Sequence, residues 1–260
     1  MSTVRRPCPQ CDRGPKDTAL AVTNDDRGTV SYCHRCGYTA SDAASVKTAF
    51  RAVDSRPEPA EWSARAEFIW CRTLPVAGSL GAIYLQERGC VLPPKDTDLR
   101  FLPATESFPP RLCARITDVL TGRPISLHFT TLAADGRGKA GTERDKLLLK
   151  GHRKSGGCIR LWPGEAVTRG LAIAEGIESA LAAAHLFTPI WAAVDAGNLA
   201  SLAVLPGVEA LTIFADNDTA GIRAAQECAA RWRAAGRDVR VLASRTAGHD
   251  AADEVRHDAA

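Results

Sequence analysis

Short apolar runs alternate with helix-like segments from about residue 170 onward. This pattern predicts strands over residues 171–174, 190–194, 211–215 and 238–242, and helices over residues 177–187 and 219–235. The second helix carries its apolar residues on one face and ends before Gly236. Strands that alternate with helices are typical of a parallel sheet with right-handed crossovers. We therefore expect an α/β domain over residues 166–260.

The preceding part of the chain has a different pattern. Ile125, Leu127 and Phe129 alternate with polar residues, and turn residues stand on either side of this run. We therefore predict an antiparallel meander over residues 112–161. Helices are predicted over residues 61–72 and 79–88. Together these segments form a mixed α+β subdomain over residues 61–165.

Two C-x-x-C pairs mark a separate module at the amino terminus. Cys8 and Cys11 form the first pair, and Cys33 and Cys36 form the second pair after 21 intervening residues. Each pair can bind one metal ion from a tight turn, and two pairs complete a tetrahedral site. Since all four ligands come from the protein, we expect a structural Zn²⁺ ion rather than a catalytic one. The predicted zinc ribbon spans residues 1–42, and residues 43–60 form a linker.

Composition and charge narrow the class of protein. With 45% hydrophobic and 24% charged residues, the 260-residue chain has an ordinary globular composition. It has no apolar run long enough to span a membrane and no secretory signal at its start, so we expect a cytoplasmic protein. Residues 61–165 hold 16 Lys and Arg against 11 Asp and Glu, whereas residues 166–260 hold 8 against 12. The middle part is basic and could bind phosphates, although a charge run is also typical of a solvated surface.

Carboxylates follow two of the predicted parallel strands. Glu175 comes directly after the first strand, and Asp216 and Asp218 follow the third. The carboxyl ends of parallel strands meet at one edge of the sheet, which is where such folds bind ligands. Three converging carboxylates must be protonated or hold a hard divalent cation, and oxygen ligands suit Mg²⁺. A single acid at a strand end is more often a helix cap, but the set of three favours a metal site.

These acidic motifs resemble those of the Toprim domain, the catalytic fold of bacterial-type primases, type IA and II topoisomerases and some nucleases. The resemblance rests on Glu175-Gly176 and on Asp216-Asn217-Asp218-Thr219-Ala220-Gly221. Asp250, with Asp253 near it, resembles the third acidic position of the family, at a different spacing. With the two C-x-x-C pairs and the runs at 84–89, 129–140 and 156–161, the chain resembles DnaG-like primases of phages, plasmids and other mobile elements.

The resemblance implies a DNA primase that makes short RNA primers on single-stranded DNA from nucleoside triphosphates. It implies that Glu175, Asp216 and Asp218 are catalytic and, with Asp250, hold Mg²⁺ or Mn²⁺. Basic residues of the middle part would bind the template or the incoming nucleotide, namely Arg137, Lys139, Lys146 and Arg160. The sequence contains no P-loop, so any replicative helicase that acts with the protein is a separate partner.

Two other functions remain open. A metal-dependent nuclease could use the same carboxylates to activate water. A non-catalytic recombination mediator resembling RecR also joins a zinc ribbon to a Toprim fold, although such mediators usually lack the full acid set. A topoisomerase is disfavoured, because it transfers DNA to a tyrosine in a separate domain and this chain has only three tyrosines.

Overall fold

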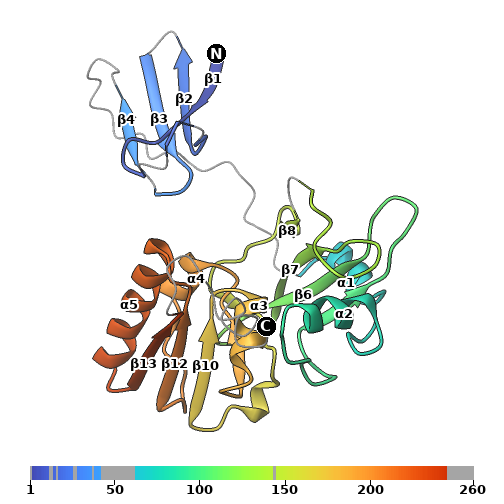
Figure 1. The fold of residues 1–260 in the computed structure, drawn as a ribbon. Coiled ribbons are helices and arrows are strands. Elements are labelled where there is room, and N and C mark those ends of the chain that lie inside the picture. Colours follow the sequence, from blue (N-terminus) through green and yellow to red (C-terminus); the bar gives the residue numbers. More distant parts are fainter. Residues whose placement is uncertain are drawn as a thin grey trace. The chain divides into compact units, whose positions relative to one another are not determined.

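The structure is a computed structural model, and it describes residues 2–11, 14–15, 17–25, 28–36, 38–41, 62–142 and 145–244 (Figure 1). The chain divides into two compact units, Met1–Arg56 and Pro57–Ala260. No described helix is both long and apolar enough to cross a membrane.

The first unit is built on a four-stranded antiparallel sheet. Its strands follow one another in the order β1 (Ser2–Arg6), β2 (Leu20–Asp25), β3 (Gly28–Cys33) and β4 (Thr39–Ser41). Its buried core consists of Cys8, Leu20 and Cys33, with a few half-buried neighbours. An apolar core of this size stabilises a fold only weakly, so the unit depends on an additional constraint, and bound metal is the usual one.

The second unit begins with two helices and an antiparallel sheet. The helices are α1 (Ala64–Trp70) and α2 (Leu80–Glu87). The strands are β5 (Leu99–Leu102), β6 (Arg111–Asp118), β7 (Pro124–Thr131), β8 (Lys146–Leu148) and β9 (Gly157–Cys158). The order is β5-β6-β7-β8, and β9 pairs with β6. The predicted helices and meander are present, whereas β5 was not predicted.

A parallel sheet follows, with the order β11-β10-β12-β13. After a single 3₁₀ turn at Gly164–Ala166, its strands are β10 (Gly170–Ala174), β11 (Ile190–Ala192), β12 (Ala210–Ala215) and β13 (Asp238–Ala243). Its helices are α3 (Ile177–Ala183), α4 (Ala196–Ala200) and α5 (Thr219–Ala234). All four strands were predicted. The short α4 was missed, because five residues are too few to show a helical period.

The helices cover both faces of the parallel sheet (Figure 1). Apolar residues of α4 and α5 pack on one face around Ile173 and Ile213. Helix α3 packs on the other face, where Leu181 shares a core with Ala172 of β10 and Leu112 of β6. Every residue of α3 is buried. This helix therefore lies between the parallel sheet and the preceding α+β part, and it holds the two in a fixed relation.

Candidate active site and metal centre

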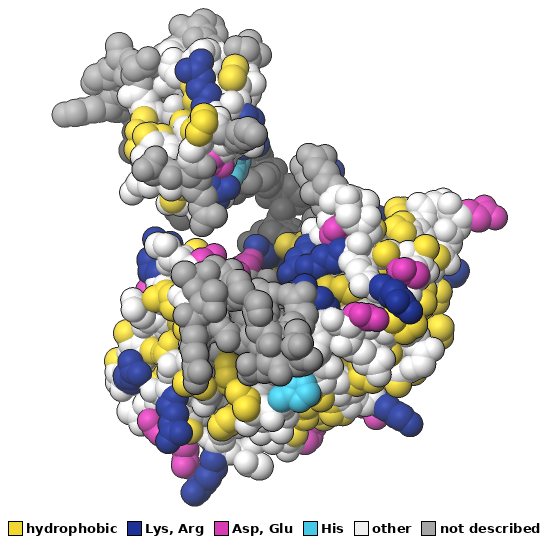
Figure 2. Space-filling view, in the orientation of Figure 1, with side chains coloured by type: hydrophobic (Ala, Val, Ile, Leu, Met, Phe, Trp, Pro, Cys, Tyr) yellow, Lys and Arg dark blue, Asp and Glu magenta, His cyan; other side chains and the backbone are white. Residues whose placement is uncertain are grey.

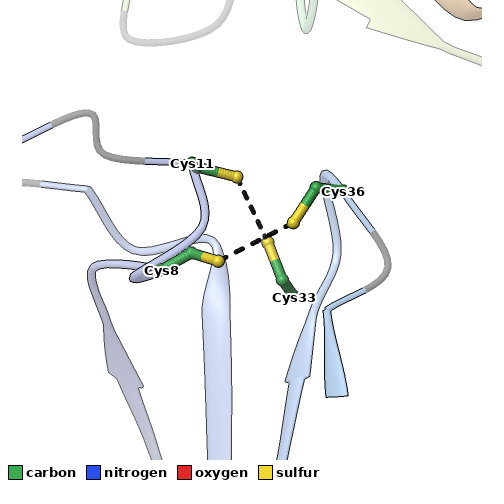
Figure 3. A group of neighbouring side chains, drawn as sticks. All are labelled: Cys8, Cys11, Cys33 and Cys36. Atoms are coloured by element: carbon green, nitrogen blue, oxygen red, sulfur yellow. Dashed lines mark hydrogen bonds between the residues drawn. The ribbon is translucent and has the colours of Figure 1, made fainter.

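Four cysteine side chains converge in the first unit (Figure 3). The Sγ atoms of Cys8 and Cys36 are 3.7 Å apart, as are those of Cys11 and Cys33, and all four lie within 4.8 Å of one another. A tetrahedron of sulfur atoms around zinc at about 2.3 Å has edges of about 3.8 Å. The ring of His34 packs edge-on against Tyr32 and is not a member of this group. The four thiols fit a structural zinc ion, as the spacing of the cysteines predicts.

Backbone groups of the second pair support a metal-binding thiolate. The N–H of Arg35 faces Sγ of Cys33 at 3.5 Å. The backbone N–H groups of Cys36 and Arg35 lower the pKa of Cys33 to about 6. A thiolate stabilised in this way is the form that binds metal.

Replacing Cys33 by serine is expected to reduce bound zinc from about one ion per chain to almost none, because three thiolates bind the ion far less tightly. Elemental analysis of the purified protein measures this loss. The exposed Cys71 is the matched control, and Cys71→Ser should keep its zinc. A Cys33→Ser protein with a full zinc complement would contradict the assignment.

A second group of functional side chains lies at the carboxyl edge of the parallel sheet. Glu175 follows β10, and Asp216 and Asp218 follow β12, which pairs directly with β10. Burial, together with the charges of Asp216, Asp218 and Asp195, raises the pKa of Glu175 to about 7. The acids therefore lie close enough to repel one another.

Local structure fixes the two aspartates. Ser179 of α3 donates a hydrogen bond from Oγ to Oδ1 of Asp216 at 3.3 Å. Asp218 is the N-cap of α5, since its Oδ1 accepts a hydrogen bond from the Gly221 N–H at 2.7 Å. A Cβ atom on Gly221 would lie 2.5 Å from the carbonyl oxygen of Asp216. Glycine thus allows α5 to begin directly beside the acidic turn.

The carboxylates are less tightly grouped than the cysteines. Within the described ranges, only the four cysteines have all their ligand atoms within 4.8 Å of one another. Asp218 also uses one oxygen as a helix cap, although its carboxylate has a second. The repulsion that raises the pKa of Glu175 is what a divalent cation would relieve, so the donor set fits such an ion. Asp250 and Asp253 lie outside the described residues.

Asp195 is a fourth acid at this edge that the sequence analysis missed. It follows β11 and caps α4, because its Oδ1 accepts a hydrogen bond from the Asn198 N–H at 2.9 Å. It also forms an ion pair with Lys154. The preceding Val194 has a φ of +78°, which is unusual for a β-branched residue. An apolar run that ends in an acid was the available signal, and it is the same signal that located Glu175.

Two of the predicted basic residues form ion pairs with Glu178 of α3. Nζ of Lys139 lies 3.4 Å from Oε1 of Glu178, and Nζ of Lys146 lies 3.4 Å from Oε2. Glu178 stands three residues after Glu175, in the first turn of α3, and is buried. Lys and Arg side chains gather beside β8 on the face shown in Figure 2.

The other two predicted basic residues lie elsewhere. The guanidinium of Arg160 packs over the ring of Trp191 at 4.8 Å and donates a hydrogen bond to the Val119 carbonyl. Arg137 is exposed in a turn, where its backbone N–H donates to Asp135. The structure brings neither side chain to Glu178, and their role in binding stays a prediction.

The raised pKa of Glu175 predicts how the fold responds to pH. The folded chain holds this proton more tightly than the unfolded chain, with a pKa of about 7 against 4.5. The ionised carboxylate therefore destabilises the fold, by an amount that grows between about pH 4.5 and 7. In buffer free of added divalent cations, Glu175→Gln should raise the melting temperature of the second unit at pH 8 by about 3 °C.

This gain in melting temperature should shrink as the pH falls below 7 and be nearly lost at pH 5. Thermal unfolding of both proteins from pH 5 to 8 measures it. Glu227, an exposed residue paired with Arg223 on α5, is the control, and Glu227→Gln should show no such trend. A stability difference that stays constant with pH would contradict a raised pKa at Glu175.

Two family models match the second unit. Residues 60–161 match a domain of unknown function, DUF7146, and residues 170–260 match the Toprim domain. No curated protein sequence matches the chain.

Solved primase structures resemble the chain at low identity. A DNA primase domain from Pseudomonas aeruginosa is 18% identical, with a TM-score of 0.40, over 71% of this chain and 57% of its own. The zinc-binding and RNA polymerase domains of the Aquifex aeolicus primase are 15% identical, with a TM-score of 0.48, over 98% of this chain and 76% of theirs. The primase fragment of the bacteriophage T7 primase-helicase protein is 15% identical, with a TM-score of 0.45, over 99% of this chain and 96% of its own. The chain thus spans little more than half of the Pseudomonas domain.

Proposed function

Because residues 170–260 carry a Toprim domain, we propose that the protein is a DNA primase that synthesises short RNA primers on single-stranded DNA. The observation that carries the proposal is the meeting of two kinds of charge. Carboxylates gather at the carboxyl edge of β10 and β12, and two lysines from the antiparallel part pair with Glu178, which stands three residues after Glu175 in the first turn of α3. Carboxylates suit a divalent cation and lysines suit phosphate groups, and a polymerising site needs both.

The residues of the acidic edge have distinct roles in this proposal. Glu175, Asp216 and Asp218 hold Mg²⁺ or Mn²⁺, and Ser179 orients Asp216 through its hydrogen bond. When bound, the cation neutralises the triphosphate and favours ionisation of the attacking hydroxyl. A cation bound here would lower the pKa of Glu175 from about 7 and keep it ionised as a ligand, and the proton of the attacking hydroxyl passes to solvent water.

The reaction proposed is nucleotidyl transfer. The 3′-hydroxyl oxygen of one nucleotide attacks the α-phosphorus of the next, the new phosphodiester bond forms and pyrophosphate leaves. Lys139 and Lys146 bind phosphate groups of the nucleotide. The zinc-containing unit contacts the single-stranded template, for which its aromatic and basic residues offer stacking and phosphate contacts.

The decisive test is primer synthesis on single-stranded templates of varied sequence, with radiolabelled ribonucleotides and Mg²⁺ or Mn²⁺. The wild-type protein should make short oligoribonucleotides. Asp216→Ala should reduce the yield by about 100-fold or more, because the variant lacks a carboxylate ligand of the divalent cation. Asp238 is the matched control, since it is exposed at the amino end of β13, far along the strand direction from the acidic edge. Asp238→Asn should retain full activity.

Two results would overturn the proposal in favour of another function. Cleavage of labelled single strands in the absence of nucleotides, lost in Asp216→Ala, would identify a nuclease. Binding of single-stranded DNA that is unaffected by removal of Mg²⁺, without any polymerisation, would identify a non-catalytic mediator. Primer synthesis that survives in Asp216→Ala would exclude the acidic edge as the active site.

A further inference from the structure

Glu178 is a buried carboxylate with three donors around it. Its side chain is only 5% exposed. Tyr84 Oη donates a hydrogen bond to Oε1 at 2.9 Å, and Nζ of Lys139 and Lys146 lie 3.4 Å from Oε1 and Oε2. Burial alone would raise the pKa of Glu178, but the charges of Lys146 and Lys139, with hydrogen bonds from its own backbone N–H and from Tyr84, lower it to about 2. Glu178 is therefore a permanent negative charge.

The two lysines share this one charge and keep one unit of positive charge in excess. Their side chains are 32% and 50% exposed, whereas Glu178 is enclosed. Each ammonium group has three N–H donors, and a distance of 3.4 Å is long for a charge-assisted hydrogen bond. The lysines are thus attracted to Glu178 but keep N–H donors available, and an anion from solvent can reach them.

His128 lies beside the lysines and adds no charge of its own. It stands on β7, where it pairs with Leu148 of β8. Lys146 is two residues before Leu148 on β8, so the side chains of His128 and Lys146 lie on the same face of the sheet. Burial, together with the charges of Lys146 and Lys139, lowers the pKa of His128 to about 4. In the described part of the chain its Nδ1 atom is buried without a hydrogen-bond partner. A buried polar atom normally has a hydrogen-bond partner, so the unpaired Nδ1 of this neutral ring is available to a bound ligand.

We propose that Glu178 is a positioning residue, anchored by Tyr84, that holds Lys139 and Lys146 together as a binding site for the triphosphate of the incoming nucleotide. The inference rests on the proposed primase function and deepens it. Two ammonium groups this close repel each other, and the shared carboxylate is what keeps them adjacent. The carboxylate comes from α3, the helix whose Ser179 orients Asp216, so one element aligns the phosphate site with the acidic edge.

The variant Glu178→Gln tests whether Glu178 positions the two lysines or only reduces the positive charge around them. The amide keeps the size of the side chain and can still accept the hydrogen bond of Tyr84, but it no longer attracts the lysines. If Glu178 merely diluted the positive charge, its removal would tighten the binding of ATP. Positioning predicts the opposite, namely a dissociation constant for ATP and a KM for nucleotides raised about tenfold, with kcat changed about twofold or less.

Equilibrium dialysis of radiolabelled ATP with Mg²⁺ and no DNA measures the affinity, and primer synthesis gives KM and kcat. Glu227→Gln, on the exposed ion pair of α5, is the control and should change neither. Glu178→Asp, which keeps the charge but withdraws it by one methylene group, should weaken ATP binding in the same direction, and it serves as the second variant if Glu178→Gln does not fold. Thermal unfolding reports whether each variant folds.

A double-mutant cycle shows whether Glu178 acts through the lysines. In a Lys139→Met, Lys146→Met background, adding Glu178→Gln should not weaken ATP binding further. ATP binding that is unchanged or tighter in Glu178→Gln and Glu178→Asp would overturn the inference, as would weaker binding of a single-stranded oligonucleotide with ATP binding intact. The dialysis needs no catalysis, so weakened ATP binding would support the phosphate site even if primer synthesis were absent.

Discussion

The burial of one carboxylate determines how the two halves of the second unit meet. Helix α3 is buried along its whole length, between the parallel sheet and the preceding part, where Tyr84 donates to Glu178 and the Val91 N–H donates to the Leu181 carbonyl. Glu178 on this helix is removed from water, where an unpaired charge is very costly, so cationic partners must come to it. Both partners come from the antiparallel part. Because buried Glu178 needs cationic partners, Lys139 and Lys146 are drawn to the first turn of α3, the helix that follows β10 and Glu175.

The acidic edge illustrates the opposite arrangement, in which charges of one sign are held together. Glu175 is kept near Asp216, Asp218 and Asp195 by the register of parallel strands and by helix caps, and its pKa records the resulting repulsion. Structures tolerate such strain where function requires it. The first unit follows the same logic, since four cysteines gathered around a small core are stable chiefly through what they bind.

Features that depend on neighbouring residues in the sequence were predicted, whereas features that depend on distant residues were not. The strands at 171–174 and 211–215 were visible because buried parallel strands read as apolar runs, and the acids that end them were found in the same way. Asp195 was missed although it stands one residue beyond a predicted strand. The pairing of Lys139 and Lys146 with Glu178 joins residues far apart in the chain, so no local pattern contains it. Arg160 was grouped with these lysines by charge, whereas its guanidinium packs on Trp191.

Asp218 has two functions in one side chain, and this affects how mutants are interpreted. Its Oδ1 caps α5, the longest helix of the described chain, whose Trp232 is fully buried against the parallel sheet. Loss of an N-cap commonly costs about 1 kcal/mol. If Asp218→Ala were inactive, the loss could come either from the missing carboxylate or from fraying of α5. Asp216, which is oriented by Ser179 and is not the N-cap residue of α5, gives the cleaner genetic probe of the same site.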